Sequence, residues 1–175
     1  EQNGERIWRL PPADVVVDPK QEGDTYPFQG ICGAVVAYKL ILCLYGKLGL
    51  LESKKRFLDG LLELAAFATV CDVMELLDEN RIIVSEGFKR MKHPANMGLG
   101  KLLESAGYDF KRKITSGFIG FGLAPRLNAG GRMGDAKRGV RLFTTRDEEE
   151  AAAIAAELEV ENSHRKETEQ MILKQ

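Results

Sequence analysis

The sequence lacks the long apolar runs and the cysteine patterns that define several large classes of protein. No stretch approaches the roughly 20 apolar residues that a membrane-spanning helix needs. The three cysteines, Cys32, Cys43 and Cys71, lie inside apolar runs without metal-ligand spacing, and their odd number argues against a disulfide framework. Residues 1–9 are polar and mixed in charge, unlike a signal peptide. We therefore expect a protein of the reducing cytoplasm, with no membrane contact.

The sequence also lacks the short motifs of several common enzyme classes. It contains no P-loop, no dinucleotide-binding fingerprint and no nucleophile elbow. His93 and His164 are the only histidines, and neither has a metal-ligand neighbour at helical spacing. Catalytic candidates must therefore be sought among carboxylates, arginines and glycine-rich segments.

The composition is that of an ordinary globular domain with an uneven charge distribution. The length of 175 residues is enough for one domain with its own hydrophobic core. Of these residues 44% are hydrophobic and 29% are charged, as is usual for a globular protein. The net charge of −1 hides a basic stretch at 101–141, with nine Lys/Arg against three Asp/Glu, and an acidic stretch at 145–175, with four against nine. The basic stretch indicates a local anion site, although on charge alone a solvated basic face is the better explanation.

The order of the predicted elements favours an α/β fold with many helices. The β-branched run Ala13–Val17 predicts a buried strand in a parallel sheet, and Gly33–Tyr45 predicts an apolar helix buried against that sheet. Asp147 opens a long helix that shows no terminator before the last residue. We interpret both ends of the chain as cuts through a larger protein; the alternative is a natural, processed small domain.

Asp72 is the first residue with a candidate chemical role. It is a single acidic residue between Ala65–Cys71 and Val73–Met74, and carboxylates in apolar surroundings are rare unless they are paired or bind metal. Carboxylate oxygens suit Mn²⁺ or Mg²⁺. A helix cap or turn residue is the alternative, and one aspartate cannot hold a catalytic metal without further ligands.

The second candidate is the glycine-rich stretch 120–132. Its glycines allow a ligand to approach the backbone, and its arginines offer forked donors suited to phosphate. We predict a phosphate-binding loop; the alternative is a tight loop with two surface arginines. The predicted phosphate- or nucleic-acid-binding residues are Arg126, Asn128, Gly130, Gly131 and Arg132.

Several segments together resemble the RecJ branch of the DHH phosphoesterase family. The matching segments lie in order along nearly the whole chain, and they depart from the family pattern at Cys71, Glu75 and Gly130. The most specific of these segments is Pro125–Arg132, which contains two arginines and an asparagine. The segments are Pro12–Lys20, Tyr26–Phe28, Cys32–Leu40, Ala68–Met74, Asn80–Arg81 with Gly87, Pro125–Arg132, and Leu158, Asn162 and Arg165.

The resemblance implies the second half of a DHH-type α/β domain, with short parallel strands packed against several helices and a long connector helix at the end. Residues 1–145 would be the C-terminal part of the catalytic domain, and 146–175 the start of the helix leading to a DHHA1 domain that this chain lacks. The resemblance makes Asp72 a metal ligand. The family's earlier aspartate motifs and its Asp-His-His triplet are absent from this sequence.

The implied activity of the whole protein is metal-dependent hydrolysis of single-stranded DNA from its 5′ end in recombination and repair, with Mn²⁺ or Mg²⁺ as cofactor. Single-stranded DNA would be its partner, and repair or replication proteins are candidate partners. The chain alone is expected to be inactive. Two alternatives are a DHH phosphodiesterase for cyclic dinucleotides or short oligonucleotides, and a non-catalytic DHH replication scaffold.

Overall fold

The structure is a computed structural model that describes residues 11–132 and 137–173, with the backbone alone at 129–132. Its elements run along the chain as follows: α1 (Gly33–Lys47), α2 (Lys55–Cys71), α3 (Asp78–Arg90), α4 (Met97–Ser105), the π-helical turn η1 (Phe118–Leu123), α5 (Ala124–Arg132), α6 (Lys137–Thr144) and α7 (Glu148–Leu173).

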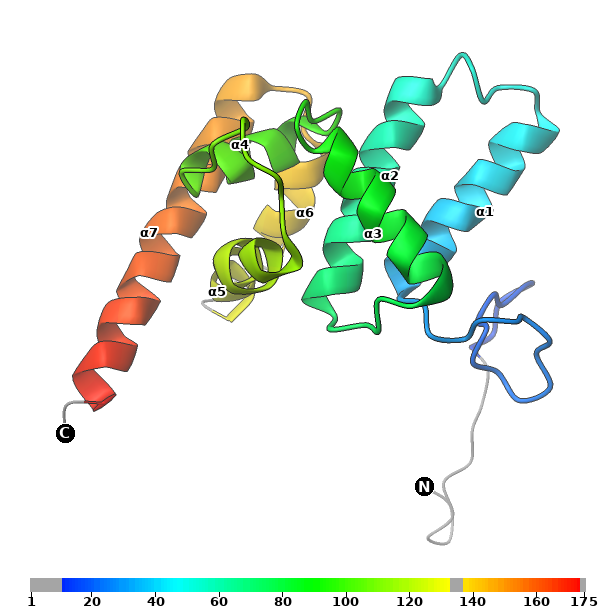
Figure 1. The fold of residues 1–175 in the computed structure, drawn as a ribbon, viewed down its shortest axis with the longest axis horizontal. Coiled ribbons are helices and arrows are strands. Elements are labelled where there is room, and N and C mark those ends of the chain that lie inside the picture. Colours follow the sequence, from blue (N-terminus) through cyan, green and yellow to red (C-terminus); the bar gives the residue numbers. More distant parts are fainter. Residues whose placement is uncertain (1–10, 133–136, 174–175) are drawn as a thin grey trace, which may run out of the picture.

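The helices form two groups that share one hydrophobic core (Figure 1). In the first group α2 packs between α1 and α3, and in the second α4, α5 and α6 pack along the long helix α7. Contacts between α2 and η1 join the two groups. None of the described helices is both long and apolar enough to cross a membrane.

The predicted α/β fold with short parallel strands is wrong, because the described residues form helices and loops without any strand. The expected strand Ala13–Val17 is irregular chain, and its side chains Val15 and Val17 are 77% and 56% exposed. A strand is stable only when a neighbouring strand pairs with its backbone groups. No described segment pairs with this run, so its β-branched composition is not enough to make a sheet.

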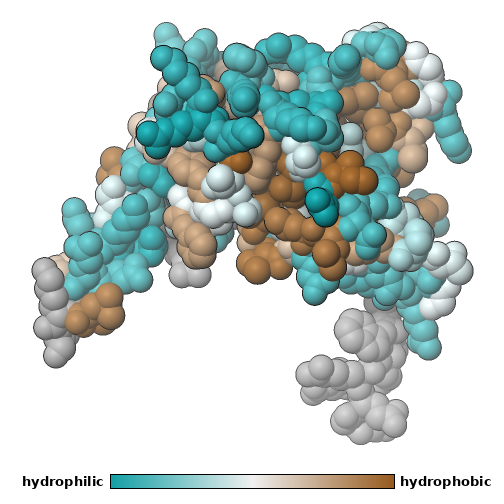
Figure 2. Space-filling view, in the orientation of Figure 1, coloured by the Kyte–Doolittle hydropathy of each residue, from teal (hydrophilic) through white to brown (hydrophobic). Residues whose placement is uncertain are grey.

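Helix α1 begins at Gly33 as predicted, but it is not buried as predicted. Val35 is fully buried against α2, whereas Leu40 and Leu44 are 56% and 50% exposed. Among the described residues there is no sheet for this outer face to pack against, which explains the difference. On the face shown in Figure 2, apolar residues gather over the α1–α3 side, while α7 at the lower left is mostly hydrophilic.

Helices α2 and α3 approach each other closely at Gly87. A Cβ atom at this position would lie 2.3 Å from the Cβ of Ala66 and 3.1 Å from the carbonyl oxygen of Leu62. Only a residue without a side chain fits there. The absence of a side chain at Gly87 therefore sets the spacing between the two helices on either side of Asp72.

Glu63 connects the first group of helices to the second. It is a fully buried residue of α2, and its carboxylate accepts hydrogen bonds from the backbone N–H groups of Ala95 (2.9 Å) and Asn96 (3.0 Å). Burial raises the pKa of Glu63, against the lowering effect of these hydrogen bonds. Asn96 in turn caps α4 by accepting the N–H of Leu99 at 2.9 Å. The position of α4 is thereby tied to α2.

We expect Gly87→Ala to lower the free energy of unfolding by about 2 kcal/mol, because the added methyl group overpacks the α2–α3 contact. Glycine to alanine inside a helix normally stabilises by about 1 kcal/mol. Gly46→Ala is the matched control, since a Cβ there would meet nothing nearer than a Leu51 side-chain atom at 3.9 Å. Urea denaturation measures both variants, and a Gly87→Ala protein as stable as the control would contradict the close packing.

Candidate functional site

Asp72 lies at the point where α2 ends. The residues before it on the helix, such as Ala66 and Thr69, are fully buried, but Asp72 itself is exposed. This corrects the expectation of a carboxylate enclosed by apolar side chains. The helix stops at Cys71, and the chain turns away from the core one residue later, so the carboxylate emerges at the surface.

A Schellman turn fixes the backbone around Asp72. The N–H of Met74 donates to the carbonyl of Thr69, and the N–H of Val73 donates to the carbonyl of Val70, each at 3.1 Å. Val73 adopts the left-handed conformation with φ +55°, which is unfavourable for a β-branched residue. Helices α1 and α4 end in the same turn with glycines at this position, Gly49 (φ +68°) and Gly107 (φ +69°).

The backbone strain at Val73 indicates that the neighbouring Asp72 belongs to a functional site. Non-glycine residues with positive φ cost about 1–3 kcal/mol and cluster at binding and catalytic sites. Val73 is 88% exposed, so burial of its side chain does not compensate for the strain. The backbone at Asp72 is thus held in one geometry at an energetic cost that the other two turns avoid.

Asp72 faces a groove of about 590 Å³ between α1 and the segment 17–20. Asp18 lines the same groove, a neighbour that the sequence pattern did not indicate. Among the described residues the Asp72 carboxylate has no salt bridge and no side-chain hydrogen bond, so its oxygens are available to a cation. The described chain holds no cluster of three or more His, Cys, Asp or Glu able to bind a metal. Asp72 therefore fits as one ligand of a site that needs more.

Cys71, the neighbour of Asp72, has a partly buried thiol. Burial raises the pKa of its thiol to about 12, with further contributions from the charge of Asp72 and from Cys32. The thiol therefore stays protonated at neutral pH.

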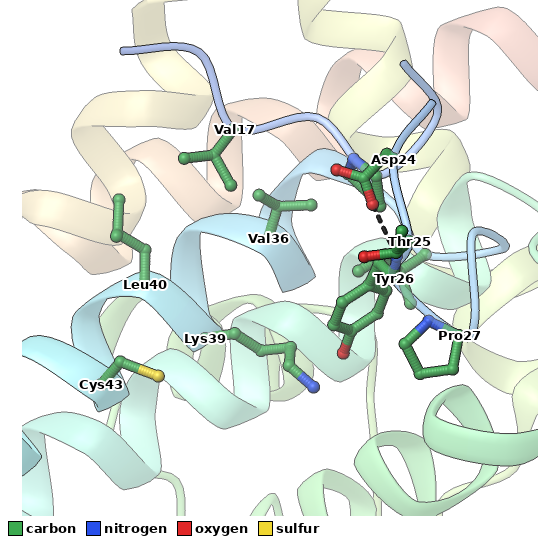
Figure 3. Close-up of a pocket in the computed structure, with 11 residues that line it drawn as sticks. Val17, Asp24, Thr25, Tyr26, Pro27, Val36, Lys39, Leu40 and Cys43 are labelled. Carbon is green, nitrogen blue, oxygen red and sulfur yellow. Dashed lines mark hydrogen bonds between the residues drawn. The ribbon is translucent and has the colours of Figure 1, made fainter. Parts of the chain in front are cut away.

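The first turn of α3 is held by a polar cluster that sequence reasoning missed. The Tyr26 hydroxyl donates to both carboxylate oxygens of Glu79 (2.6 and 2.8 Å), and Lys39 of α1 forms an ion pair with Glu79 at 2.5 Å. Figure 3 shows Lys39 extending toward the ring of Tyr26, whose centroid lies 5.2 Å from its ammonium nitrogen. Burial raises the pKa of Glu79, but the hydrogen bonds from Lys39 and Tyr26 outweigh it, so the net shift is downward. The ionised cluster connects α3 with α1.

The predicted glycine-rich phosphate loop is helical instead. Residues 118–123 form the π-helical turn η1, which continues directly into α5 up to Arg132. Glycine composition favours a loop, but here the segment is packed between α2 and α7, and packing overrides local propensity. The Cβ position of Gly120 lies 3.9 Å from a side-chain atom of Val70, so η1 contacts the last turn of α2, which ends at Cys71.

Arg126 is buried and engaged within the protein. Its guanidinium donates to the carboxylate of Glu159 on α7 and to the carbonyl of Gly122. Asn128 is exposed on α5. Gly130, Gly131 and Arg132 belong to the last turn of α5, and their side-chain positions, including the guanidinium of Arg132, lie outside the described residues. The structure thus packs η1 against Val70 in the last turn of α2, while the described contacts of Arg126 point to α7.

Comparison with known proteins identifies similar chains. No family model matches this sequence. The single-stranded-DNA-specific exonuclease RecJ of Bacillus subtilis (strain 168) is 40% identical over 156 residues, which are 89% of this chain and 19% of that protein. RecJ of Escherichia coli (strain K12) is 35% identical over 168 residues, which are 92% of this chain and 29% of that protein.

Solved structures of RecJ have the same fold over this segment. A crystal structure of RecJ bound to manganese superposes on 97% of this chain with a TM-score of 0.79 and 33% identity, and the match covers 41% of that chain. RecJ of Thermus thermophilus in complex with Mg²⁺ superposes on 86% with a TM-score of 0.72 and 33% identity, covering 23% of that chain. The resemblance to RecJ is confirmed, and this chain spans between about a fifth and three tenths of the two curated relatives' lengths.

We expect Val73→Gly to raise the free energy of unfolding by about 1 kcal/mol, because glycine adopts the left-handed conformation without strain. The matched control is Val160→Gly on the exposed side of α7, where glycine should lower stability by about 1 kcal/mol. Chemical denaturation of both variants measures the difference. A destabilised Val73→Gly protein would show that Val73 is not strained.

We expect Arg126→Ala to lower the free energy of unfolding by about 2 kcal/mol in the absence of any ligand, since it removes bonds to Glu159 and Gly122 from a buried position. A double-mutant cycle with Glu159→Gln should give a coupling energy of about 1 kcal/mol. Arg112→Ala, at an arginine whose side chain is 82% exposed, should change stability by less than about 0.5 kcal/mol. An Arg126→Ala protein as stable as Arg112→Ala would refute the structural role.

Proposed function

We propose that this chain is part of a metal-dependent exonuclease that hydrolyses single-stranded DNA. The observation that carries the proposal is the Asp72 carboxylate. It lies on a groove at a strained helix end, unpaired among the described residues, in a chain similar to RecJ. A carboxylate kept free of protein partners is suited to a hard divalent cation. The proteins it resembles are single-stranded-DNA-specific exonucleases, and solved structures of RecJ contain Mn²⁺ or Mg²⁺.

The residues of this chain would have separate tasks in that reaction. Asp72 would hold Mn²⁺ or Mg²⁺ together with ligands from other parts of the protein. The bound metal supplies an activated water and stabilises negative charge on the phosphoryl oxygens. The predicted phosphate-binding residues are Arg126, Asn128, Gly130, Gly131 and Arg132, and they would orient the DNA backbone. Arg126 would act mainly by fixing α5 against α7, given its contacts.

The wider setting follows from the same proposal. The whole protein would degrade DNA from the 5′ end during recombination and repair in the cytoplasm, alongside repair or replication proteins. Residues 1–145 would complete the catalytic domain, and residues 146–175 would lead to a further domain. Helix α7 begins at Glu148, after Asp147 accepts the N–H groups of Glu149 (2.9 Å) and Glu150 (3.2 Å), which is consistent with that boundary.

We expect the full-length protein to digest single-stranded DNA only when Mn²⁺ or Mg²⁺ is present, and the isolated 175-residue chain to digest none. In the full-length protein Asp72→Asn should lower the rate by more than about 100-fold, because even residues that only support metal ligands cost about 10–100-fold. Asp109→Asn, at an exposed aspartate of a loop, is the control and should keep full activity. Metal-dependent digestion that survives Asp72→Asn would disprove the metal role.

A further inference from the structure

Asn80 is a buried amide that bridges the two loops around the candidate site. It lies in the first turn of α3 and is fully buried. Its side-chain nitrogen donates to the carbonyl of Glu75 at 2.8 Å and to the carbonyl of Gly30 at 2.7 Å. Glu75 follows Asp72 by three residues, and Gly30 directly precedes Ile31, which lines the groove. One side chain therefore ties the Asp72 loop to the segment that leads into α1.

The orientation of this amide is determined by its partners. Both partners are carbonyl oxygens, which accept hydrogen bonds only, so the nitrogen of Asn80 must face them. The side-chain oxygen is then left buried, with no hydrogen-bond partner among the described residues. An unsatisfied buried acceptor is unfavourable, and such a group in a native structure needs an explanation. We explain this cost by the role of the amide nitrogen, which holds two backbone segments in place. An apolar side chain could not do this.

The loop that Asn80 braces has strained backbone at both ends. It begins after Asp72 with Val73 at φ +55° and ends at Asp78 with φ +40°. Positive φ values at non-glycine residues persist only where the surroundings enforce them. Asn80 supplies one such constraint inside the loop, and the neighbouring Glu79 is itself fixed by Tyr26 and Lys39.

We propose that Asn80 is a positioning residue for the metal ligand Asp72, acting through the carbonyl of Glu75. Asn80 holds the loop so that the Asp72 carboxylate stays directed at the groove and does not fold back. The inference rests on the proposed function, because Asp72 matters in this way only if it binds a metal. Residues that orient a metal ligand typically change metal affinity by about 10–100-fold when they are replaced.

The experiment measures Mn²⁺ binding to the full-length protein by isothermal titration and by electron paramagnetic resonance of the free ion. Asn80→Ala should weaken Mn²⁺ binding by about 10-fold or more. Digestion of single-stranded DNA by this variant should need a correspondingly higher Mn²⁺ concentration, while its rate at saturating Mn²⁺ recovers. The isosteric Asn80→Asp, which presents acceptors to two carbonyls, should weaken binding at least as much.

Asn96→Ala is the matched control for a purely structural effect. Asn96 also makes two side-chain hydrogen bonds, but on the α4 side of the molecule. It caps α4 by accepting from Leu99 at 2.9 Å, and it donates to the carbonyl of Phe143 in α6 at 3.0 Å. This variant should lose stability and keep the Mn²⁺ affinity of the unmodified protein. If Asn80→Ala fails to fold, Asn80→Ser takes its place, because serine retains one hydrogen-bond donor. We expect Asn80→Ser to weaken Mn²⁺ binding less than Asn80→Ala would.

The possible outcomes separate this inference from the proposed function. If the unmodified protein binds no Mn²⁺, or if Asp72→Asn binds it equally well, the proposed function itself fails. If Asp72→Asn abolishes binding but a folded Asn80→Ala binds Mn²⁺ as tightly as the unmodified protein, only the role of Asn80 is overturned. If Asn96→Ala weakens Mn²⁺ binding as much as Asn80→Ala does, the role of Asn80 is also overturned, because the effect would then come from general destabilisation.

Discussion

The way α2 ends is the constraint on which the candidate site depends. The chain must leave the helix directly after Asp72, and it does so through a left-handed Val73 held by hydrogen bonds to Thr69 and Val70. A helix that continued for another turn would place residues 75 and 76 beside Asp72 on the same helix face. The sharp exit instead leaves the carboxylate at the rim of a groove, without a salt bridge or side-chain hydrogen bond to any described residue.

The rest of the fold keeps that helix end in place. The missing side chain of Gly87 lets α3 lie against α2, Glu63 ties α4 to the same helix, and η1 packs on its last turn beside Val70. These contacts come from parts of the chain far apart in sequence. Together they explain how the backbone at Asp72 is held in a defined geometry.

The sequence predicted several features correctly and others wrongly, for identifiable physical reasons. The helix start at Gly33 and the resemblance to RecJ were recognisable from local pattern and motif order. The strand at Ala13–Val17 was wrong, because β-branched residues make a strand only where a partner strand exists. The prediction of a loop at 120–132 was wrong, because packing between α2 and α7 enforces helix on a segment with poor helix propensity.

The sequence by itself determined which residue types are present for chemistry: one aspartate after an apolar run, and arginines within a glycine-rich stretch. Such information is local, because side-chain chemistry and helix periodicity can be read from neighbouring residues. Only the tertiary structure decided that Asp72 is exposed, that Arg126 pairs with Glu159, and that Asn80 bridges two loops. Burial and pairing depend on contacts between distant segments, and no local pattern encodes them.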